Sequence, residues 1–278
     1  MWLGDNVYPD TEGLEQIQRE YNTVLAQPGY QRLSSRTTVL GTWDDHDYGA
    51  RDAGKEFSAR QESQQQFLDF LAVPQDSPRR HQAGVFSSKD LAWRNASVRI
   101  ILLDTRYHRD AFDSDGTVLG QEQWQWLEHQ LASSKALVNI IASSIQVVPD
   151  EHPYEKWGRF SSDQRRLLEL FANTSAKNLI VLSGDRHMAE ISRLDLGPWT
   201  AQETRPAKTL YEVTSSSLSR SSEGTPFERN RYRIGDVYRG INFGTLTLEH
   251  QPSGDFVRLS VHDSEGATQL SHRLALTH

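Results

Sequence analysis

The sequence predicts an α/β fold whose carboxyl-terminal part consists mainly of β-strands. Up to residue 182, short apolar runs rich in β-branched residues alternate with amphipathic stretches of helix length, as in layered α/β proteins. From Leu210 onward, strand-like stretches follow one another without helices between them. A chain of 278 residues is long enough for one large domain, and we expect a single domain over residues 1–278.

Four predicted strands in the first part end abruptly in polar residues. Because charged or hydroxyl-bearing residues follow each apolar run at once, we expect chemistry at the carboxyl ends of these strands. The strands are Thr37 to Gly41 before TWDDHD, Val98 to Leu103 before DTRYHR, Leu137 to Ala142 before SSIQ, and Asn178 to Leu182 before SGDRH.

Four amphipathic helices are predicted in the same part of the chain. In the third, Trp124, Leu127 and Leu131 recur at helical spacing and form an apolar stripe along one face. The helices are Glu12 to Gln27, Ser58 to Leu71, Gln121 to Leu131, and Ser161 to Asn173.

Further strands are predicted around LYEVTSS, INFGTLTLE, DFVRLSVHD and ATQLSHRLAL, with a turn at PSG between the second and third. The stretch from Ser215 to Asp236 is rich in Ser, Arg and Glu and has no periodicity. We expect a surface loop there that reaches over a site.

Charge and composition exclude several classes of function. A net charge of −7 and a sequence pI near 5.8 disfavour binding to a nucleic-acid polymer, which needs clustered Lys and Arg. The chain has no cysteine, so disulfides, thiolate catalysis and Cys-type zinc sites are excluded within these residues. No apolar run approaches the roughly 20 residues of a transmembrane helix, and MWLGDNVYPD lacks the basic and apolar parts of an export signal. We expect no transmembrane segment and no signal peptide, and the localisation stays open.

The first candidate motif is Gly4-Asp5-Asn6-Val7-Tyr8, directly after the strand-like residues Trp2 and Leu3. A glycine permits a sharp turn, and a carboxylate at the end of a strand can face a cleft. An Asp that caps the turn into the next helix would give the same pattern, so both interpretations stay open.

The second motif is Trp43-Asp44-Asp45-His46-Asp47, after the first predicted strand. Three carboxylates around one imidazole repel one another unless a cation or hydrogen bonds compensate. Oxygen ligands with imidazole suit iron, manganese, zinc or calcium, and a histidine that does not bind the metal could act as a general acid. The alternative is a solvated acidic loop with an incidental histidine.

The third motif, Gly184-Asp185-Arg186-His187, repeats the layout of the first, because a buried strand is again followed by Gly-Asp and a further type of ligand. In an extended segment, Asp185 and His187 would point to the same side, as two ligands of one centre require. A turn Asp beside a hydrogen-bonded histidine is the alternative.

Two arginines occur in the fourth motif, Asp104 to Arg109. Guanidinium groups bind phosphate oxygens, but they also fix loops through carboxylates, and we favour the structural interpretation here. The serine clusters at 143–144 and 215–217 lack a Gly-x-Ser-x-Gly elbow, which gives a serine hydrolase little support.

In this order, GDNVY, TWDDHDYG, LDTRYHR, LGQEQWQWL, LSGDRH, LYEVTSSSL and NFGTLTLE resemble the PhoD-like alkaline phosphatases and phosphodiesterases. The resemblance covers nearly the whole chain, and the combination of WDDHD with a later GDRH is specific. It implies the metallophosphoesterase fold, a sandwich of two mixed β-sheets flanked by helices with a dinuclear metal centre at the strand ends. It also implies metal-dependent hydrolysis of phosphate monoesters or diesters.

The resemblance further implies a set of metal ligands. Asp5 would bridge two ions, and Tyr8 would bind iron as a phenolate. The implied metals are iron and calcium, with manganese or zinc as further candidates. The full implied set is Asp5, Tyr8, Asp45, Asp185 and His187.

Asp45 and His46 are the implied catalytic residues. A metal-activated hydroxide would attack phosphorus, and His46 would protonate the leaving alcohol. Asn6 and Arg106 are candidates for binding the substrate, a small phosphate ester.

Two features leave a second interpretation open. Only Met1 to Leu3 precede the first Gly-Asp turn, whereas relatives carry a further strand ending in Gly-Ser-Cys, whose cysteine contributes to the metal centre. Arg51 stands where relatives commonly have asparagine, and a cation there would oppose a second metal. The alternative is a catalytically impaired relative that binds phosphate-bearing ligands, or one that needs a partner strand. Substrate choice and oligomeric state also stay open.

Overall fold

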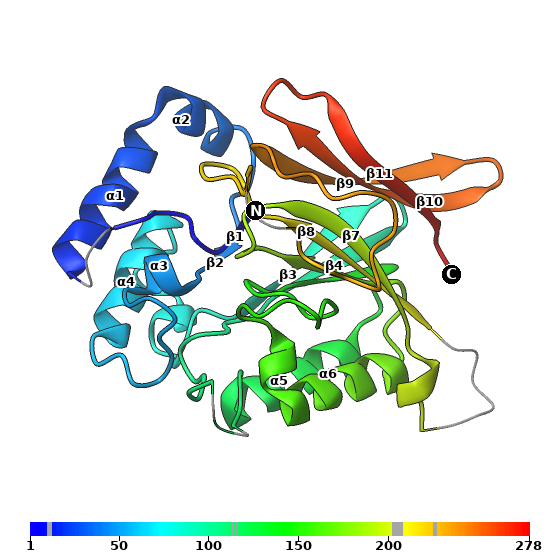
Figure 1. Ribbon diagram of the computed structural model, residues 1–278, viewed down its shortest axis with the longest axis horizontal. Helices are drawn as coiled ribbons and strands as arrows, with labels where there is room; N and C mark the ends of the chain where they lie inside the picture. The colour runs from blue at the N-terminus through cyan, green and yellow to red at the C-terminus, as the bar shows by residue number, and fades with distance from the viewer. Residues whose placement is uncertain (10–12, 113, 115, 202–207, 225–226) are drawn as a thin grey trace.

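A six-stranded mixed β-sheet forms the centre of the structure (Figure 1), a computed structural model that describes all residues except 10–12, 113, 115, 202–207 and 225–226. Its strands are β3 (Ser87–Trp93), β4 (Ala96–Leu102), β5 (Val138–Ala142), β6 (Leu179–Ser183), β7 (Ala189–Asp195) and β8 (Thr209–Ser215). Their order is β3-β4-β5-β6-β8-β7. The four middle strands run parallel, whereas β3 and β7 pair antiparallel at the two edges. The carboxyl ends of the parallel strands therefore lie at one end of the sheet.

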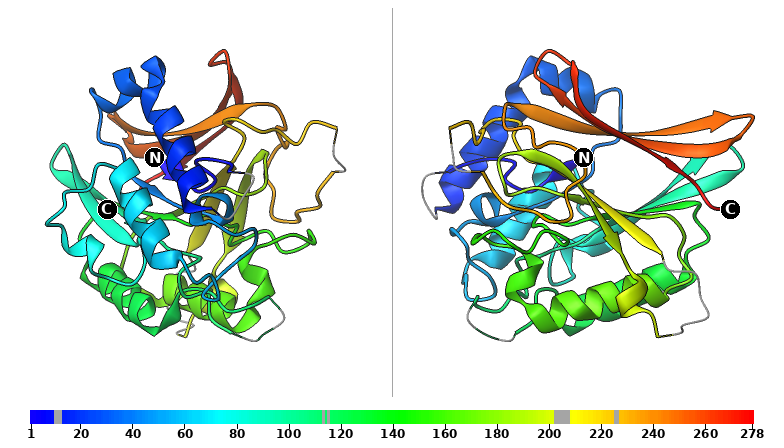
Figure 2. Two further views of the ribbon diagram at one scale, coloured as in Figure 1. Left: turned by 90° about the vertical axis from the view of Figure 1, so that its left-hand side faces the viewer. Right: turned by 45° about the vertical axis from the view of Figure 1, so that its right-hand side comes forward.

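A second sheet covers one face of the central sheet (Figure 2). It contains β9 (Asn242–Gln251), β10 (Gly254–Asp263) and β11 (Thr268–Ala275), all antiparallel, in the order β11-β10-β9. Val98, Ile100 and Leu102 of β4 share one core cluster with Val257 and Leu259 of β10. The two sheets thus form a sandwich with an apolar interior.

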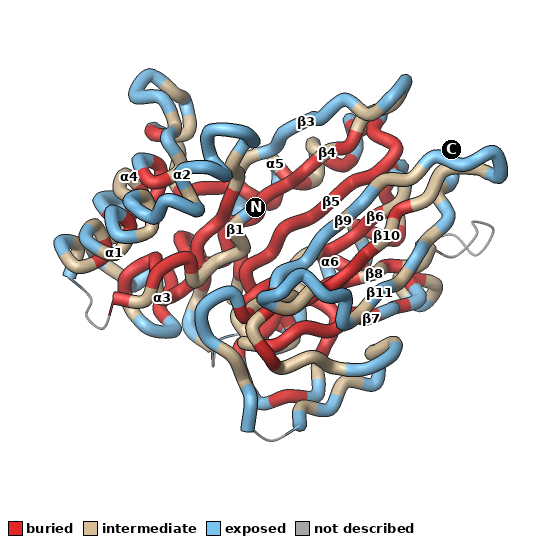
Figure 3. The backbone as a smooth tube through the Cα atoms, turned by 90° about the horizontal axis from the view of Figure 1, so that it is seen from above, coloured by how far each residue is buried: buried red, intermediate tan, exposed pale blue. Residues whose placement is uncertain are grey.

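Helices α5 (Gly120–Ser133) and α6 (Ser161–Asn173) cover the opposite face of the central sheet (Figure 1). Leu127 of α5 and Phe171 of α6 share a cluster with Ile101 of β4, so alternate residues of this strand face opposite layers. Figure 3 shows the burial that follows from this layering. The middle strands are buried along most of their length, while β3 at the edge and β9 of the outer sheet are largely exposed.

A short parallel pair of strands, β1 (Trp2–Leu3) and β2 (Gly41–Thr42), lies beside the remaining helices. These are α1 (Leu14–Ala26), α2 (Pro28–Ser34), α3 (Asp45–Tyr48) and α4 (Arg60–Phe70). A 3-10 helix at Pro78–Arg80 contacts α4, whereas those at Trp157–Arg159 and Gly197–Trp199 contact α6. A third cluster with many aromatic side chains, Trp43 and Phe67 among them, holds this part together. The indole N–H of Trp43 donates to Oδ1 of Asp104 at 2.9 Å, which ties the second motif to the end of β4.

The predicted fold class is confirmed, with differences in detail. The strand expected at Thr37 to Gly41 is reduced to β2, because its partner β1 is only two residues long. The outer sheet is antiparallel rather than mixed, because short turns connect its consecutive strands; the turn at PSG is present. β3 and β7 were not predicted. The expected helix start at Glu12 lies outside the described residues, and the single domain over 1–278 stays a prediction. No helix in the described parts of the chain is long and apolar enough to cross a membrane.

Truncating Leu259 tests the contact between the two sheets. The side chain is fully buried, so Leu259→Ala should leave a cavity and lower the free energy of unfolding by about 2–5 kcal/mol. Thr247→Val, at an exposed position of β9, is the control and should change it by less than about 0.5 kcal/mol. Urea unfolding followed by circular dichroism measures both, and equal stability of the two variants would contradict the sandwich packing.

Candidate metal centre

Two Gly-Asp turns approach each other closely at the carboxyl ends of β1 and β6. A Cβ atom on Gly4 would lie 2.5 Å from the Cβ of Asp44, and a Cβ on Gly184 would lie 2.9 Å from the carbonyl oxygen of Leu3. A side chain does not fit at such distances, so both positions require glycine. The close approach brings the aspartates that follow the two glycines to one place.

The residues after the two glycines have a left-handed backbone conformation. The φ angle is 50° at Asp5, 65° at Asp185 and 52° at His187. The expectation that Asp185 and His187 lie on an extended segment is wrong, because both residues have positive φ and residues 185–188 form a bend. Asp185 lies close to Asp5 and Asp44, whereas His187 approaches only Asp5, with its Nε2 3.9 Å from Oδ2 of that residue. Non-glycine residues seldom adopt positive φ, and such residues cluster at functional sites.

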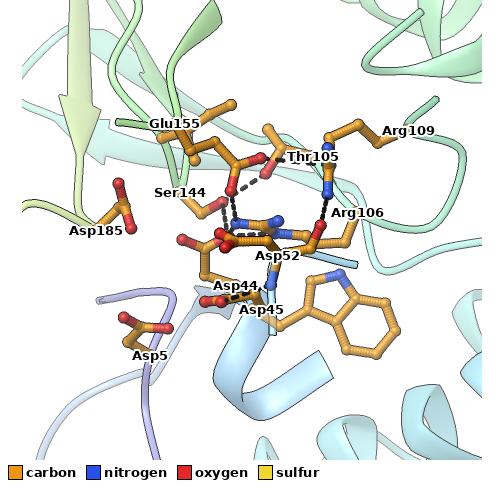
Figure 4. Close-up of polar contacts among 12 residues, drawn as sticks. Asp5, Asp44, Asp45, Asp52, Thr105, Arg106, Arg109, Ser144, Glu155 and Asp185 are labelled. Carbon is orange, nitrogen blue, oxygen red and sulfur yellow. Dashed lines mark hydrogen bonds and ion pairs between the residues drawn. The ribbon is translucent and has the colours of Figure 1, made fainter. Parts of the chain in front are cut away.

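Two groups of potential metal ligands share Asp5 (Figure 4). Asp5, Asp45 and His46 form the first group; Asp5, Asp44 and Asp185 form the second. Within each group, one ligand atom per residue lies within 4.8 Å of the others. Carboxylate oxygens with an imidazole suit a range of cations, including iron, calcium, manganese and zinc.

The carboxylates of this centre lack the partners that burial requires. Oδ1 of Asp5 and Oδ2 of Asp44 are buried and have no hydrogen-bond partner among the described residues. Burial, followed by the charges of Asp44 and Asp45, raises the pKa of Asp5. Burial also raises the pKa of Asp185. A cation would offset both the repulsion and the missing hydrogen bonds, so these residues fit a bound metal.

Tyr8 and His187 adjoin Asp5. The hydroxyl of Tyr8 donates to Oδ2 of Asp5 at 3.1 Å and lies 3.1 Å from Nε2 of His187, which is itself 3.9 Å from Oδ2 of Asp5. Burial, and then the Asp5 carboxylate, raises the pKa of Tyr8, while burial lowers the pKa of His187. A phenolate would therefore need a nearby cation, whereas the neutral imidazole is already in the form that binds metals.

His46 and Asp45 lie at the start of α3. The His46 ring is half-buried, 4.6 Å from the Tyr8 ring between centroids, and burial lowers its pKa. Oδ2 of Asp45 accepts a hydrogen bond from the backbone N–H of Asp52 at 2.9 Å. Burial alone would raise the pKa of Asp45. The charges of Arg106 and His46, together with this hydrogen bond, outweigh burial and lower the pKa. His46 can thus act either as a ligand or as a proton donor.

Asp47 fixes the first two motifs to each other. Its Oδ1 accepts hydrogen bonds from the backbone N–H groups of Asp44 at 2.7 Å and Asp5 at 3.1 Å. The amide of Asn6 donates to Asp47 and, at 3.1 Å, to the carbonyl oxygen of Thr42. Oδ1 of Asn6 is buried without a partner among the described residues. Asn6 thus lies beside the centre with one free acceptor.

Arg106 lies beside the carboxylates but away from any surface that a substrate could reach. It is fully buried, pairs with Asp44, and donates to Oε2 of Glu155 at 2.6 Å (Figure 4). Its motif is otherwise structural, since Oδ1 of Asp104 accepts from the backbone N–H groups of Arg106 and Tyr107, both at 2.9 Å. This burial supports a role in positioning Asp44, and the substrate-binding role expected from the sequence stays a prediction.

Several residues of the centre escaped the sequence analysis. Asp44 was seen in the acidic motif, but the pattern could not distinguish which of three carboxylates faces the centre. Ser144, which donates to Oδ1 of Asp44 at 2.9 Å, was only a candidate for hydrogen bonding. Glu155 had no signal, because it lies in an irregular segment far from every motif.

The sandwich with carboxylates gathered at its strand ends defines a metallophosphoesterase-like protein. The model of the PhoD-like phosphatase family matches residues 2–242, and the chain therefore belongs to this metal-dependent family.

Alkaline phosphatase D of Bacillus subtilis (strain 168) is 29% identical over 115 residues, which cover 34% of this chain and 20% of that protein. A solved structure of PhoD aligns with 100% of this chain and 66% of its own, with a TM-score of 0.67 and 17% identity. The structure of GAP50, the anchor in the inner membrane complex of Plasmodium, aligns with 99% of this chain and 77% of its own chain, with a TM-score of 0.61 and 12% identity. At such identities the two structures show the fold alone. The chain spans less than two thirds of alkaline phosphatase D and of PhoD.

Metal binding should stabilise the fold through Asp5. Calcium or manganese added to chelator-treated protein should raise the melting temperature, with a gain of about 2.7 kcal/mol at a hundredfold excess over Kd. Asp5→Asn should remove most of this rise in melting temperature, because Asp5 belongs to both groups. Without metal, the variant should be at least as stable as the unchanged protein, because one of the repelling charges is gone. Asp76→Asn, at an exposed carboxylate outside both groups, is the control. Scanning fluorimetry measures the shifts, and an unchanged metal response in Asp5→Asn would contradict the assignment.

Arg106→Leu tests the positioning role. Asp44 would be left buried without its cation and Glu155 would keep only Arg109, so the free energy of unfolding should fall by about 3–5 kcal/mol. Arg166→Leu, which removes an exposed ion pair with Glu128, should cost about 1 kcal/mol or less. Adding Asp44→Asn to Arg106→Leu should recover part of the lost free energy of unfolding, as measured by urea unfolding. No recovery would mean that the arginine acts mainly by filling space.

Proposed function

We propose that this protein hydrolyses phosphate monoesters or diesters with two metal ions bound around Asp5. The observation that carries the proposal is the sharing of Asp5 between two groups of ligand atoms, each within 4.8 Å. Membership of the PhoD-like phosphatase family supports it. A shared carboxylate between two ligand groups is the arrangement that a two-metal hydrolase needs.

The proposed ligands come from both groups and their neighbours. Asp5 would serve both ions, Asp44 and Asp185 would serve one, and Asp45 would serve the other. Tyr8 and His187, which lie beside Asp5, would take the place of His46 in the first group and leave it free for proton transfer. Asp44 is added to the residues expected from the sequence. Iron and calcium are the proposed metals, with manganese or zinc as alternatives. When bound, such a pair would make a water molecule acidic and polarise the phosphoryl oxygens for in-line displacement.

The residues of the chain would hold these ligands in place and move one proton. Asp47 fixes the backbone of Asp5 and Asp44, and Arg106 orients the Asp44 carboxylate. His46, with Asp45 close enough to stabilise its protonated form, would give a proton to the leaving oxygen. Asn6, whose Oδ1 is buried without a partner among the described residues, stays a candidate for contact with substrate.

A protein that binds phosphate-bearing ligands without hydrolysing them is the second candidate. It is favoured by one observation, because Arg51 directly precedes Asp52, whose backbone N–H donates to Oδ2 of Asp45 at 2.9 Å, and a cation beside this ligand would oppose a second metal.

Elemental analysis combined with hydrolysis assays separates the two candidates. The chelator-treated protein is assayed with 4-nitrophenyl phosphate and bis(4-nitrophenyl) phosphate before and after addition of iron, calcium, manganese or zinc. Two metals per chain with restored turnover are expected for the hydrolase. If no metal restored turnover but the protein still bound inorganic phosphate, the second candidate would be favoured.

The role of His46 predicts a dependence on the leaving group. His46→Ala should lower kcat/KM for an alkyl phosphate roughly 10²–10⁴-fold, because its leaving alcohol needs a proton, and should affect 4-nitrophenyl phosphate far less. His81→Ala, at an exposed histidine, is the control. If His46 were instead a metal ligand, both substrates would lose rate together and the metal content would fall.

A further inference from the structure

Arg186 belongs to the third motif, but the proposed reaction gives it no role. Its side chain is only 10% exposed, and Nη1 lies 3.4 Å from Oδ2 of the proposed ligand Asp185. A guanidinium in this place opposes a metal ion, because both are cations that bind the same carboxylate. Arg220, by comparison, is exposed and stacks on the Tyr8 ring, with its Cζ 4.0 Å from the ring centroid. Arg186 therefore needs a partner that offsets its charge.

Glu228 is that partner. Its two carboxylate oxygens accept hydrogen bonds from Arg186, one from Nε at 3.3 Å and the other from Nη2, and its side chain is only 15% exposed. Tyr154 covers the guanidinium, with the ring centroid 3.9 Å from Cζ. A carboxylate that binds through both oxygens fixes the orientation of a guanidinium as well as offsetting its charge. Nη1 is the nitrogen left for Asp185.

Hydrogen bonds to β7 hold Glu228 in place. The carbonyl oxygen of Glu228 accepts from Nη2 of Arg233 at 2.8 Å, and Nε of Arg233 donates to Oε2 of the buried Glu190 of β7 at 2.6 Å. Between them, Asn230 donates to Oε1 of Glu190 at 2.9 Å and to Oγ of Ser192 at 2.8 Å. The carboxylate of Glu228 is therefore positioned by the edge of the central sheet.

The two acidic partners of Arg186 are bound unequally. Glu228 takes two hydrogen bonds from the guanidinium, whereas the contact with Asp185, at 3.4 Å, is long for a hydrogen bond between charged groups. Asp185 also belongs, with Asp5 and Asp44, to one group of ligand atoms within 4.8 Å of one another. Because Arg186 is bound mainly by Glu228, the carboxylate of Asp185 keeps its negative charge for a cation.

We propose that Glu228, acting through Arg186, is a positioning residue that keeps Asp185 available to a metal ion. This inference rests on the proposed function, in which Asp185 and Asp44 serve one of two ions. Without the charge of Glu228, the guanidinium of Arg186 would bind Asp185 instead and compete with the ion for that carboxylate.

Metal affinity tests this inference without turnover. Calcium or manganese is titrated into the chelator-treated full chain and followed by calorimetry. Glu228→Gln should raise the dissociation constant of one bound ion at least roughly tenfold, because a charge-assisted partner of Arg186 is lost. Glu228→Ala removes the same charge and should act in the same direction, so the test does not depend on one variant folding. Unchanged affinity in both variants would overturn the inference.

Removing the arginine as well separates competition from a loss of loop structure. In Arg186→Met/Glu228→Gln no guanidinium is left to bind Asp185, and the dissociation constant should return to within about threefold of that of the unchanged protein. If the double variant stayed as weak as Glu228→Gln, Glu228 would act by holding its loop, and the inference would be wrong. Glu128→Gln, which removes the partner of the exposed Arg166, is the matched control and should change nothing.

A second pair of variants tests whether the effect passes through Asp185. In Asp185→Asn, the ion that depends on this carboxylate is already weakened, so adding Glu228→Gln should change its affinity by less than about threefold. An undiminished loss on adding Glu228→Gln would show that the charge acts on the centre as a whole, which would contradict a role through Asp185.

Hydrolysis assays on the same variants separate this inference from the proposed function. Absence of turnover with every metal, together with the expected pattern of metal affinities, would refute the proposed hydrolysis while supporting the role of Glu228. Metal-restored turnover with equal metal affinity in Glu228→Gln and the unchanged protein would do the reverse.

Discussion

Mutual repulsion among buried carboxylates is the constraint on which the centre of this structure depends. Asp5, Asp44, Asp45 and Asp185 converge at the strand ends, and burial strengthens every interaction between their charges. The chain offsets part of this repulsion itself, through Arg106 on Asp44 and through backbone N–H groups on Asp47. The remaining negative charge is what would attract cations to this centre, and the burial of Asp44 and Asp45 distinguishes it from a solvated acidic loop.

The rest of the fold holds these groups against their tendency to separate. Asp5, Asp185 and His187 have left-handed backbones, each of which costs on the order of 1–3 kcal/mol in a non-glycine residue. Such conformations persist only where the surroundings fix them, and here the central sheet, with helices on one face and a second sheet on the other, provides the rigid frame. Loops on this frame supply the exposed groups, Arg220 among them.

The sequence predicted the α/β alternation and the motifs of the centre because both depend on local patterns, whereas the sandwich of two sheets was implied by the family resemblance. Apolar runs ending in Gly-Asp located the ends of β1 and β6, and helical spacing located α5 and α6. Three features depend on tertiary contacts and left no such pattern: the choice of Asp44 beside Asp45, the burial of Arg106, and the contribution of Glu155. The exposed edge strand β3 was missed because its SSKDLAW sequence lacks the apolar alternation of a buried strand.

The sharing of Asp5 between two ligand groups has a thermodynamic consequence. Two ions that use one carboxylate cannot bind independently, since the first to arrive alters the charge and orientation of a ligand that the second requires. By linkage, whatever factor the first ion imposes on the affinity of the second, the second imposes equally on the first. In the proposed two-metal centre, the occupancy of each position would therefore depend on the other, and depletion of one ion would change the affinity for its neighbour.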